Sequence, residues 1–100
     1  MNQIDLTVTI DKPAGEAESL ILDRVDTRLR SVGLTGRHLN GTLEYRPKFI
    51  GLPLVWLIRR LQGEGVTFTF TERGPVTHVL ARGKLRDRAH AEVTEALGGD

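Results

Sequence analysis

Few residues in this chain have side chains that could do chemistry. Its histidines are His38, His78 and His90, and its only serines, Ser19 and Ser31, fall in one predicted helix. Neither serine follows the Gly-rich pattern of a nucleophile elbow. Because the chain has no cysteine, thiol catalysis, disulfides and Cys-ligated metals are excluded. We therefore expect no catalytic residues and a protein that is not an enzyme.

The histidines could instead be metal ligands or core residues. Asp87 and His90 are three residues apart on the solvent side of the last predicted helix, so a metal there would need a third ligand from elsewhere. No second ligand pair has a supporting spacing, and we expect a solvated helix face with no metal and no cofactor. His78 is in phase with Val76 and Leu80. It is therefore either a buried, hydrogen-bonded histidine or part of an open sheet face.

Nucleic acid is not an expected partner. Residues 33–36, Gly-Leu-Thr-Gly, have the form of a KH loop, but they join a predicted helix to a strand rather than two helices. Residues 63–65, Gly-Glu-Gly, place an acid in a poor phosphate cradle, and no Walker lysine follows. The aromatic residues of the predicted strands are in the phase assigned to the core, which argues against a stacking platform. One local basic cluster remains, made of Arg46, Lys48, Arg59 and Arg60.

The most apolar stretch of the chain is FIGLPLVWLIRRLQ, residues 49–62. Pro53 suits the first turn of a helix, and Gly63 suits its end, so we expect a helix over 53–62. One stripe of this helix is apolar and is expected to anchor it in the core. The stripe consists of Leu54, Leu57, Ile58 and Leu61.

Trp56 lies outside that stripe, between Arg59 and Arg60 on the helical wheel. Trp beside Arg is typical of a surface that meets a protein partner, a second copy of the chain or a membrane interface. The alternative is that Trp56 folds over the helix edge and packs on a neighbouring element. The stretch is too short to span a bilayer. The predicted partner-binding residues are Phe49, Ile50, Leu52, Trp56, Arg59 and Arg60.

The rest of the chain alternates between strand and helix patterns, in the order β-α-β-α-β-β-α. This order predicts an α+β fold in which a four-stranded, mainly antiparallel sheet has its helices packed on one face. In the second strand Leu39, Leu43 and Tyr45 are expected to face inward, with a bulge or a close helix crossing at Gly41. Predicted strands cover 3–10, 37–46, 66–72 and 76–82, and predicted helices cover 16–32, 53–62 and 84–97.

Composition sets the broad class. One hundred residues, with 39% hydrophobic and 27% charged, fit a single folded domain over 1–100. A net charge of +1 gives no global attraction to nucleic acid or to anionic membranes. The excess of Arg over Lys is associated with high-GC bacterial genomes. The first ten residues lack the pattern of a signal peptide, so a cytoplasmic location is the expectation.

Over most of the chain, the order of the predicted elements resembles a shortened helix-grip (START-like) domain. The resemblance is in this order alone and includes no signature residue. That resemblance implies an apolar ligand cavity between the sheet and the C-terminal helix. It defines our alternative function, a small domain that binds an apolar ligand.

Overall fold

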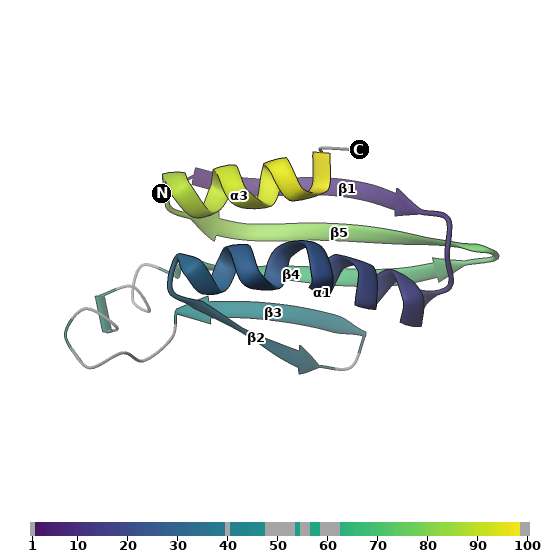
Figure 1. Cartoon of the computed structure of the whole chain (residues 1–100), viewed down its shortest axis with the longest axis horizontal. Helices are drawn as coiled ribbons and strands as arrows, with labels where there is room; N and C mark the ends of the chain where they lie inside the picture. Colours follow the sequence, from purple (N-terminus) through teal and green to yellow (C-terminus); the bar gives the residue numbers. More distant parts are fainter. Residues whose placement is uncertain (1, 40, 48–53, 55–56, 59–62, 99–100) are drawn as a thin grey trace.

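The computed structural model describes residues 2–39, 41–47, 54, 57–58 and 63–98. These residues build a sheet and two labelled helices (Figure 1). In chain order the elements are β1 (Asn2–Ile10), α1 (Ala14–Ser31), β2 (Leu34–Leu39), β3 (Thr42–Pro47), β4 (Gly65–Arg73), β5 (Val76–Leu85) and α3 (Asp87–Gly98).

The strands form one antiparallel sheet in the order β1-β5-β4-β3-β2. The first and second strands therefore lie at opposite edges, and α1 carries the chain from one edge to the other (Figure 1). Gly74 and Pro75 connect β4 to β5, which confirms the predicted hairpin. The α+β class and the antiparallel pairing are confirmed.

The predicted number of strands is wrong. The segment 37–46, expected to be one strand, belongs to a hairpin of β2 and β3, which gives the sheet five strands. Gly41 lies in the turn between them with a φ of 71°, so it does not form a bulge within a strand. Asn-Gly at 40–41 is the sequence signal of a tight hairpin turn, and it outweighs the alternation that runs through it.

The hairpin also changes which side chains of β2 face the helices. Leu43 and Tyr45 are buried as expected, but Leu39 is 44% exposed and pairs with Thr42 on the opposite face. His38 instead lies opposite Leu43, on the helix side of the sheet. A turn between two strands resets the inward phase, and a single alternating pattern cannot reproduce this.

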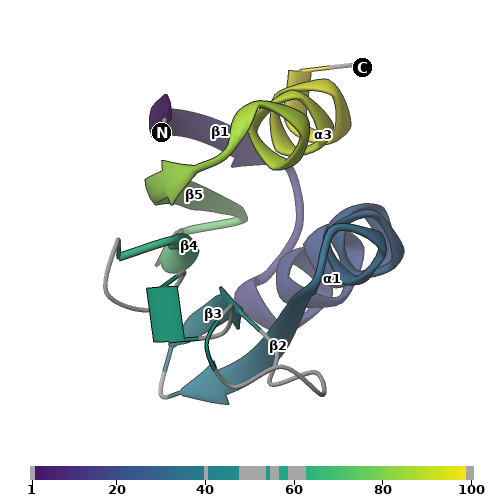
Figure 2. The same ribbon diagram turned by 90° about the vertical axis from the view of Figure 1, so that its left-hand side faces the viewer.

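Both helices cover the same face of the sheet (Figure 2). They bury one stripe each, because residues three and four apart fall on one side of a helix. Val25 and Leu29 of α1, and Ala89 and Val93 of α3, are essentially inaccessible to solvent. Neither helix covers the other face of the sheet (Figure 2). The strands form the other side of the core, with Ile4, Ile10, Leu34, Leu43, Tyr45, Val66, Phe68, Val79, Ala81 and Leu85.

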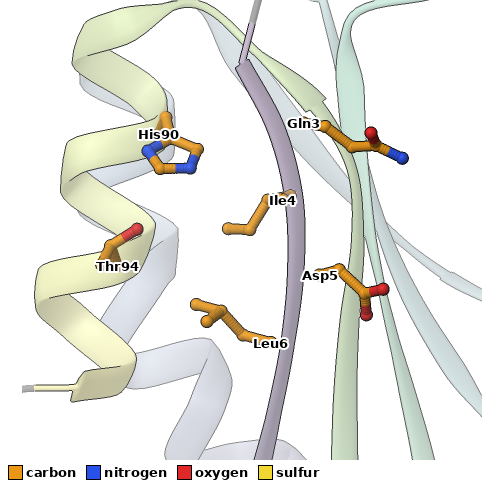
Figure 3. A pocket seen from close by; sticks show the side chains of 6 residues that line it. All are labelled: Gln3, Ile4, Asp5, Leu6, His90 and Thr94. Carbon is orange, nitrogen blue, oxygen red and sulfur yellow. The ribbon is translucent and has the colours of Figure 1, made fainter.

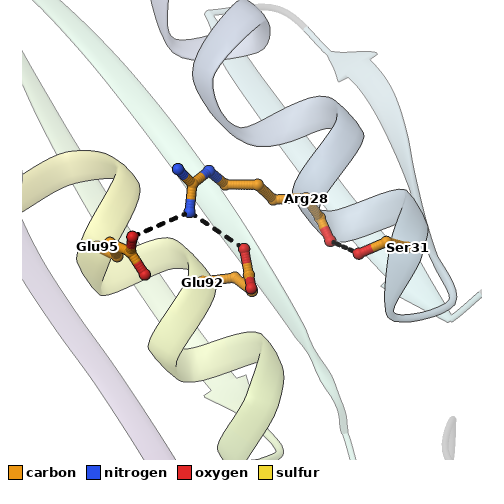
Figure 4. Close-up of polar contacts among 4 residues, drawn as sticks. All are labelled: Arg28, Ser31, Glu92 and Glu95. Atoms are coloured by element: carbon orange, nitrogen blue, oxygen red, sulfur yellow. Dashed lines mark hydrogen bonds and ion pairs between the residues drawn. The ribbon is translucent and has the colours of Figure 1, made fainter.

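Arg28 links the two helices across their outer surface (Figure 4). Its Nη1 lies 3.2 Å from Glu92 Oε2 and 3.8 Å from Glu95 Oε1. Glu92 of α3 therefore pairs with a residue of α1. These pairs are partly exposed and stabilise the helix packing by at most about 1 kcal/mol each.

The predicted strand 76–82 is too short, because β5 continues through Gly83 to Leu85. The reason is a close approach of neighbouring backbones. A Cβ at Gly83 would lie 2.0 Å from the carbonyl oxygen of Gly65. Glycine here permits pairing of β5 with both β1 and β4, and the last helix begins only at Asp87.

Candidate functional site

The predicted partner-binding residues lie outside the described residues. This applies to all six: Phe49, Ile50, Leu52, Trp56, Arg59 and Arg60. Within the stretch 49–62 the structure describes Leu54, Leu57 and Ile58. It also describes the strand ends on either side of the stretch, at Pro47 and Gly65.

Leu54, Leu57 and Ile58 have helical backbone, in agreement with the predicted helix over 53–62. Their side chains are nevertheless 68%, 44% and 46% exposed. The prediction that this stripe anchors the helix in the core is therefore wrong at all three described positions. Helical periodicity identifies an apolar face but does not say whether the protein's own core or another molecule covers it.

The return of the chain to the sheet is fixed by a buried ion pair that sequence reasoning missed. Glu64 directly precedes β4, and its side chain is fully inaccessible to solvent. The Arg86 Nε donates a hydrogen bond of 2.6 Å to its Oε2, from a side chain that is 47% exposed. Glu64 also has a further interaction. In the sequence, Gly-Glu-Gly at 63–65 indicates only a turn that would bind phosphate poorly. The available signal is the place of Glu64 between two glycines at the start of a strand.

Gly65, the next residue, packs directly on β3. A Cβ at this position would lie 2.6 Å from the Tyr45 carbonyl oxygen. Pro47, where β3 ends, is buried. The two ends of the 48–64 connection are therefore held rigidly in the sheet, which gives this apolar stretch a fixed point of departure and return.

A second feature is an open hollow of about 450 Å³ between β1 and α3. Ile4 and Leu6 point into it from the strand, and His90 and Thr94 line it from the helix (Figure 3). Directly beneath α3 the space is filled by buried residues such as Val93. The hollow thus lies at the edge of the sheet, in the region where the helix-grip resemblance implies a ligand.

The histidines are dispersed. The Nδ1 of His38 lies 2.5 Å from Glu18 Oε1, and the Nδ1 of His78 lies 3.1 Å from the Thr9 hydroxyl. His78 is thereby assigned to the open sheet face, the second of its two predicted positions. Among residues 2–39, 41–47, 54, 57–58 and 63–98, no group of three His, Cys, Asp or Glu side chains could hold a metal.

The other polar groups considered are engaged in structural contacts. The Ser31 hydroxyl donates to the carbonyl oxygen of Arg28 at 2.6 Å (Figure 4). Arg46, the one described member of the basic cluster, pairs with Glu44 at 2.7 Å. Neither serine is brought beside a histidine by a described hydrogen bond.

No helix in the described part of the chain has the length and apolarity needed to cross a bilayer.

Among the described residues, Tyr45 is the titratable group whose pKa is clearly perturbed. It is fully buried, its hydroxyl donates to Asp26 Oδ1 at 2.9 Å, and its ring meets Phe68 edge-on. Burial, followed by the hydrogen bond to the Asp26 carboxylate, raises the pKa of the Tyr45 phenol well above its usual range. Its environment is the interface between α1 and the sheet, so the shift reflects packing and not a catalytic role.

The fold thus defines a small α+β domain with a five-stranded antiparallel sheet and both helices on one face. Neither a scan against protein-family models nor a search of curated proteins found a match to this chain.

Proposed function

We propose that this chain is a small non-enzymatic interaction domain that docks a protein partner through the apolar stretch 49–62. The observation that carries the proposal is the exposure of Leu54, Leu57 and Ile58. Three large aliphatic side chains within five residues form an uncovered apolar patch, and such patches mark interaction surfaces.

The partner should present an apolar groove with carboxylates at its rim. Positions 54, 57 and 58 share one face of a helix, which is the pattern of helix-in-groove recognition. Arg59 and Arg60 follow directly in the sequence, and Trp and Arg are the residue types that most often dominate interface energy. Acidic groups at the rim would complement the two guanidinium groups.

A protein groove is favoured over a membrane surface. The chain has 14 basic and 13 acidic residues, so its net charge supplies almost no attraction to anionic lipids. Membrane binding would then depend on the apolar residues of one short helix, whereas a shaped groove adds close packing to the same burial.

Site-specific photo-crosslinking tests the proposal. A benzophenone amino acid replaces Leu57 in one variant and Thr27, an exposed position on α1, in the control variant. In extract of the native host, position 57 should give a discrete protein adduct that position 27 does not give. The adduct should be lost when Leu54 and Ile58 are both changed to Glu. Burying a leucine-sized side chain contributes about 1.5–3 kcal/mol, so losing two should weaken binding by at least about a hundredfold.

The supporting result also requires that the crosslinked peptide of the partner lie in an apolar groove with acidic residues. Adducts equal to those from position 27, or adducts that persist in the double Glu variant, would overturn the proposal. So would crosslinking to a second copy of the chain, or sedimentation of the purified protein with vesicles of neutral or anionic phospholipid. Because the replaced side chains are exposed, the free energy of unfolding of each variant should be within about 0.5 kcal/mol of the wild-type value.

The hollow beside Ile4 and Leu6 favours a second candidate function, the binding of a small apolar ligand between the sheet and the C-terminal helix. No cofactor is involved. The test is binding of an apolar fluorescent probe to the folded protein and to a Thr94→Trp variant, in which the indole fills the hollow. Binding that is unchanged by this substitution would reject the site.

A further inference from the structure

The sheet face opposite α1 and α3 carries a row of side chains that crosses every strand in register. From β1 to β2 the row consists of Asp5, Arg82, Thr67, Glu44 and Arg37. Neighbours in this row are cross-strand partners, and each is out of phase with the buried residues of its own strand. The charges therefore read negative, positive, neutral, negative, positive at neutral pH.

When one copy of this row is laid against a second copy that runs in the opposite direction, every charge faces a charge of the other sign. β4 is the central strand, and Thr67 is the central residue of the row. A two-fold rotation about an axis along β4 places Asp5 of one copy opposite Arg37 of the other, and Arg82 opposite Glu44. Each charge then meets its opposite, and Thr67 meets Thr67.

We propose that two copies of the chain associate face to face through this row, about a two-fold axis that runs along β4. The occupant of the open sheet face is thus a second copy of the chain. This interface is distinct from the apolar stretch 49–62 and does not depend on the function proposed for it.

Electrostatics selects this axis over its alternative. A two-fold axis along the row would place Asp5 opposite Asp5 and Arg82 opposite Arg82, and like charges brought together at an interface cost several kcal/mol. The axis along β4 also keeps the strands of both sheets nearly aligned, which is the common geometry of sheet-on-sheet packing.

The next row along the strands supports the same arrangement. It consists of Thr7, Leu80, Thr69, Thr42 and Leu39, and it contains no charge. Under the proposed axis Leu80 faces Thr42 and Leu39 faces Thr7. Leu39, which is 44% exposed in the single chain, would thereby be covered.

Asp5 and Arg82 pair only weakly within one chain, whereas Glu44 accepts a hydrogen bond of 2.7 Å from Arg46 Nε. Arg82 Nε lies 3.5 Å from Asp5 Oδ1, with both side chains more than half exposed. Such a pair contributes little in water and can bridge to a second copy without loss. In the neighbouring row on the other side, Lys84 of one copy would approach Arg46 of the other copy. The Arg46 guanidinium is paired with Glu44 at 2.7 Å. The lysine side chain is long enough to turn to solvent.

The area is sufficient for a stable interface. Five strands at about 4.8 Å spacing, six to ten residues long, offer about 600 Å² per copy, or about 1,200 Å² in total. This lies at the lower end of the range for specific complexes, and the face is polar. We therefore expect a dimer that dissociates on dilution and in high salt.

Charge reversal with complementation tests the interface. Arg82→Glu and Glu44→Arg each place like charges face to face twice in a homodimer. Mixed in equal amounts, the two variants restore all four opposite-charge pairs in a heterodimer. The matched control is Arg88→Glu, an equal change of charge at an exposed position of α3.

Light scattering and sedimentation over about a hundredfold range of concentration give the readout. Wild type and Arg88→Glu should dimerise, each single variant of the row should dimerise at least about tenfold more weakly, and their mixture should recover the wild-type dimer. A monomeric wild type, an Arg82→Glu protein that dimerises like wild type, or a mixture as weak as its components would overturn the proposal. Leu57→Glu should leave the dimer intact, so this proposal and the docking proposal fail separately.

Discussion

The ion pair between Glu64 and Arg86 predicts an unequal response to the loss of either partner. The Glu64 carboxylate is fully buried, whereas the Arg86 side chain is 47% exposed. Arg86→Ala leaves a carboxylate that water reaches poorly, and Glu64→Gln leaves a guanidinium that is already half solvated. The first change should therefore destabilise the protein more than the second.

The magnitudes follow from the burial of the group left behind. Breaking a fully buried pair costs about 3–5 kcal/mol. Because the Arg86 side chain is 47% exposed, this pair is not fully buried, so Arg86→Ala should cost about 2–3 kcal/mol. Glu64→Gln retains an acceptor and strands only an accessible cation, so it should cost about 1 kcal/mol. In a domain of this size these values correspond to about 10–20 °C and about 5 °C in melting temperature.

Urea unfolding of the two variants, with Arg88→Ala as the exposed control, measures the difference. The control should remain within about 0.5 kcal/mol of wild type. An unfolding free energy that falls as much for Glu64→Gln as for Arg86→Ala would refute the reasoning, because it would mean that burial of the remaining partner does not set the penalty.

Two further predictions concern Tyr45. Its pKa is raised in the folded state above the usual value of about 10, so the folded protein holds the phenol proton more tightly than the unfolded chain does. Stability from this group is complete below about pH 10 and should fall by up to about 1.4 kcal/mol per pH unit above it, a slope that Tyr45→Phe should remove in alkaline unfolding experiments. A Cβ at Gly36 would lie 2.8 Å from the Tyr45 ring, so Gly36→Ala should cost about 1–3 kcal/mol. Gly15→Ala, on α1 with no atom within 4 Å, should be neutral or stabilising; equal melting temperatures for the two variants would contradict this.

Much of the fold could be predicted because its periodicities are local. Ile4 and Ile10 of β1, and Val25 and Leu29 of α1, face the core as their spacing indicates. The main error arose where two local signals competed. The turn at Gly41 interrupts an alternation that continues in the sequence, and the Asn-Gly signal at 40–41 decides the structure against that alternation.

The candidate site could be predicted only in part, for a different physical reason. The amphipathic pattern of Leu54, Leu57 and Ile58 indicates which side chains share a helix face, but their exposure depends on whether another element lies against that face. Glu64 was missed because its partner, Arg86, is distant in sequence and no periodic pattern connects them.

The two proposed surfaces have a joint consequence. Rotation about an axis parallel to β4 preserves the direction of every strand, so in the proposed dimer β3 ends and β4 begins at the same end in both copies. Pro47 and Gly65, between which the apolar stretch is connected, would thus lie at one end of the dimer in duplicate. A partner with two grooves at a matching distance could engage both stretches, and the second contact would then be intramolecular. Binding to such a partner should weaken with Arg82→Glu even though this residue lies outside the docking stretch, while binding to a partner with a single groove should not change.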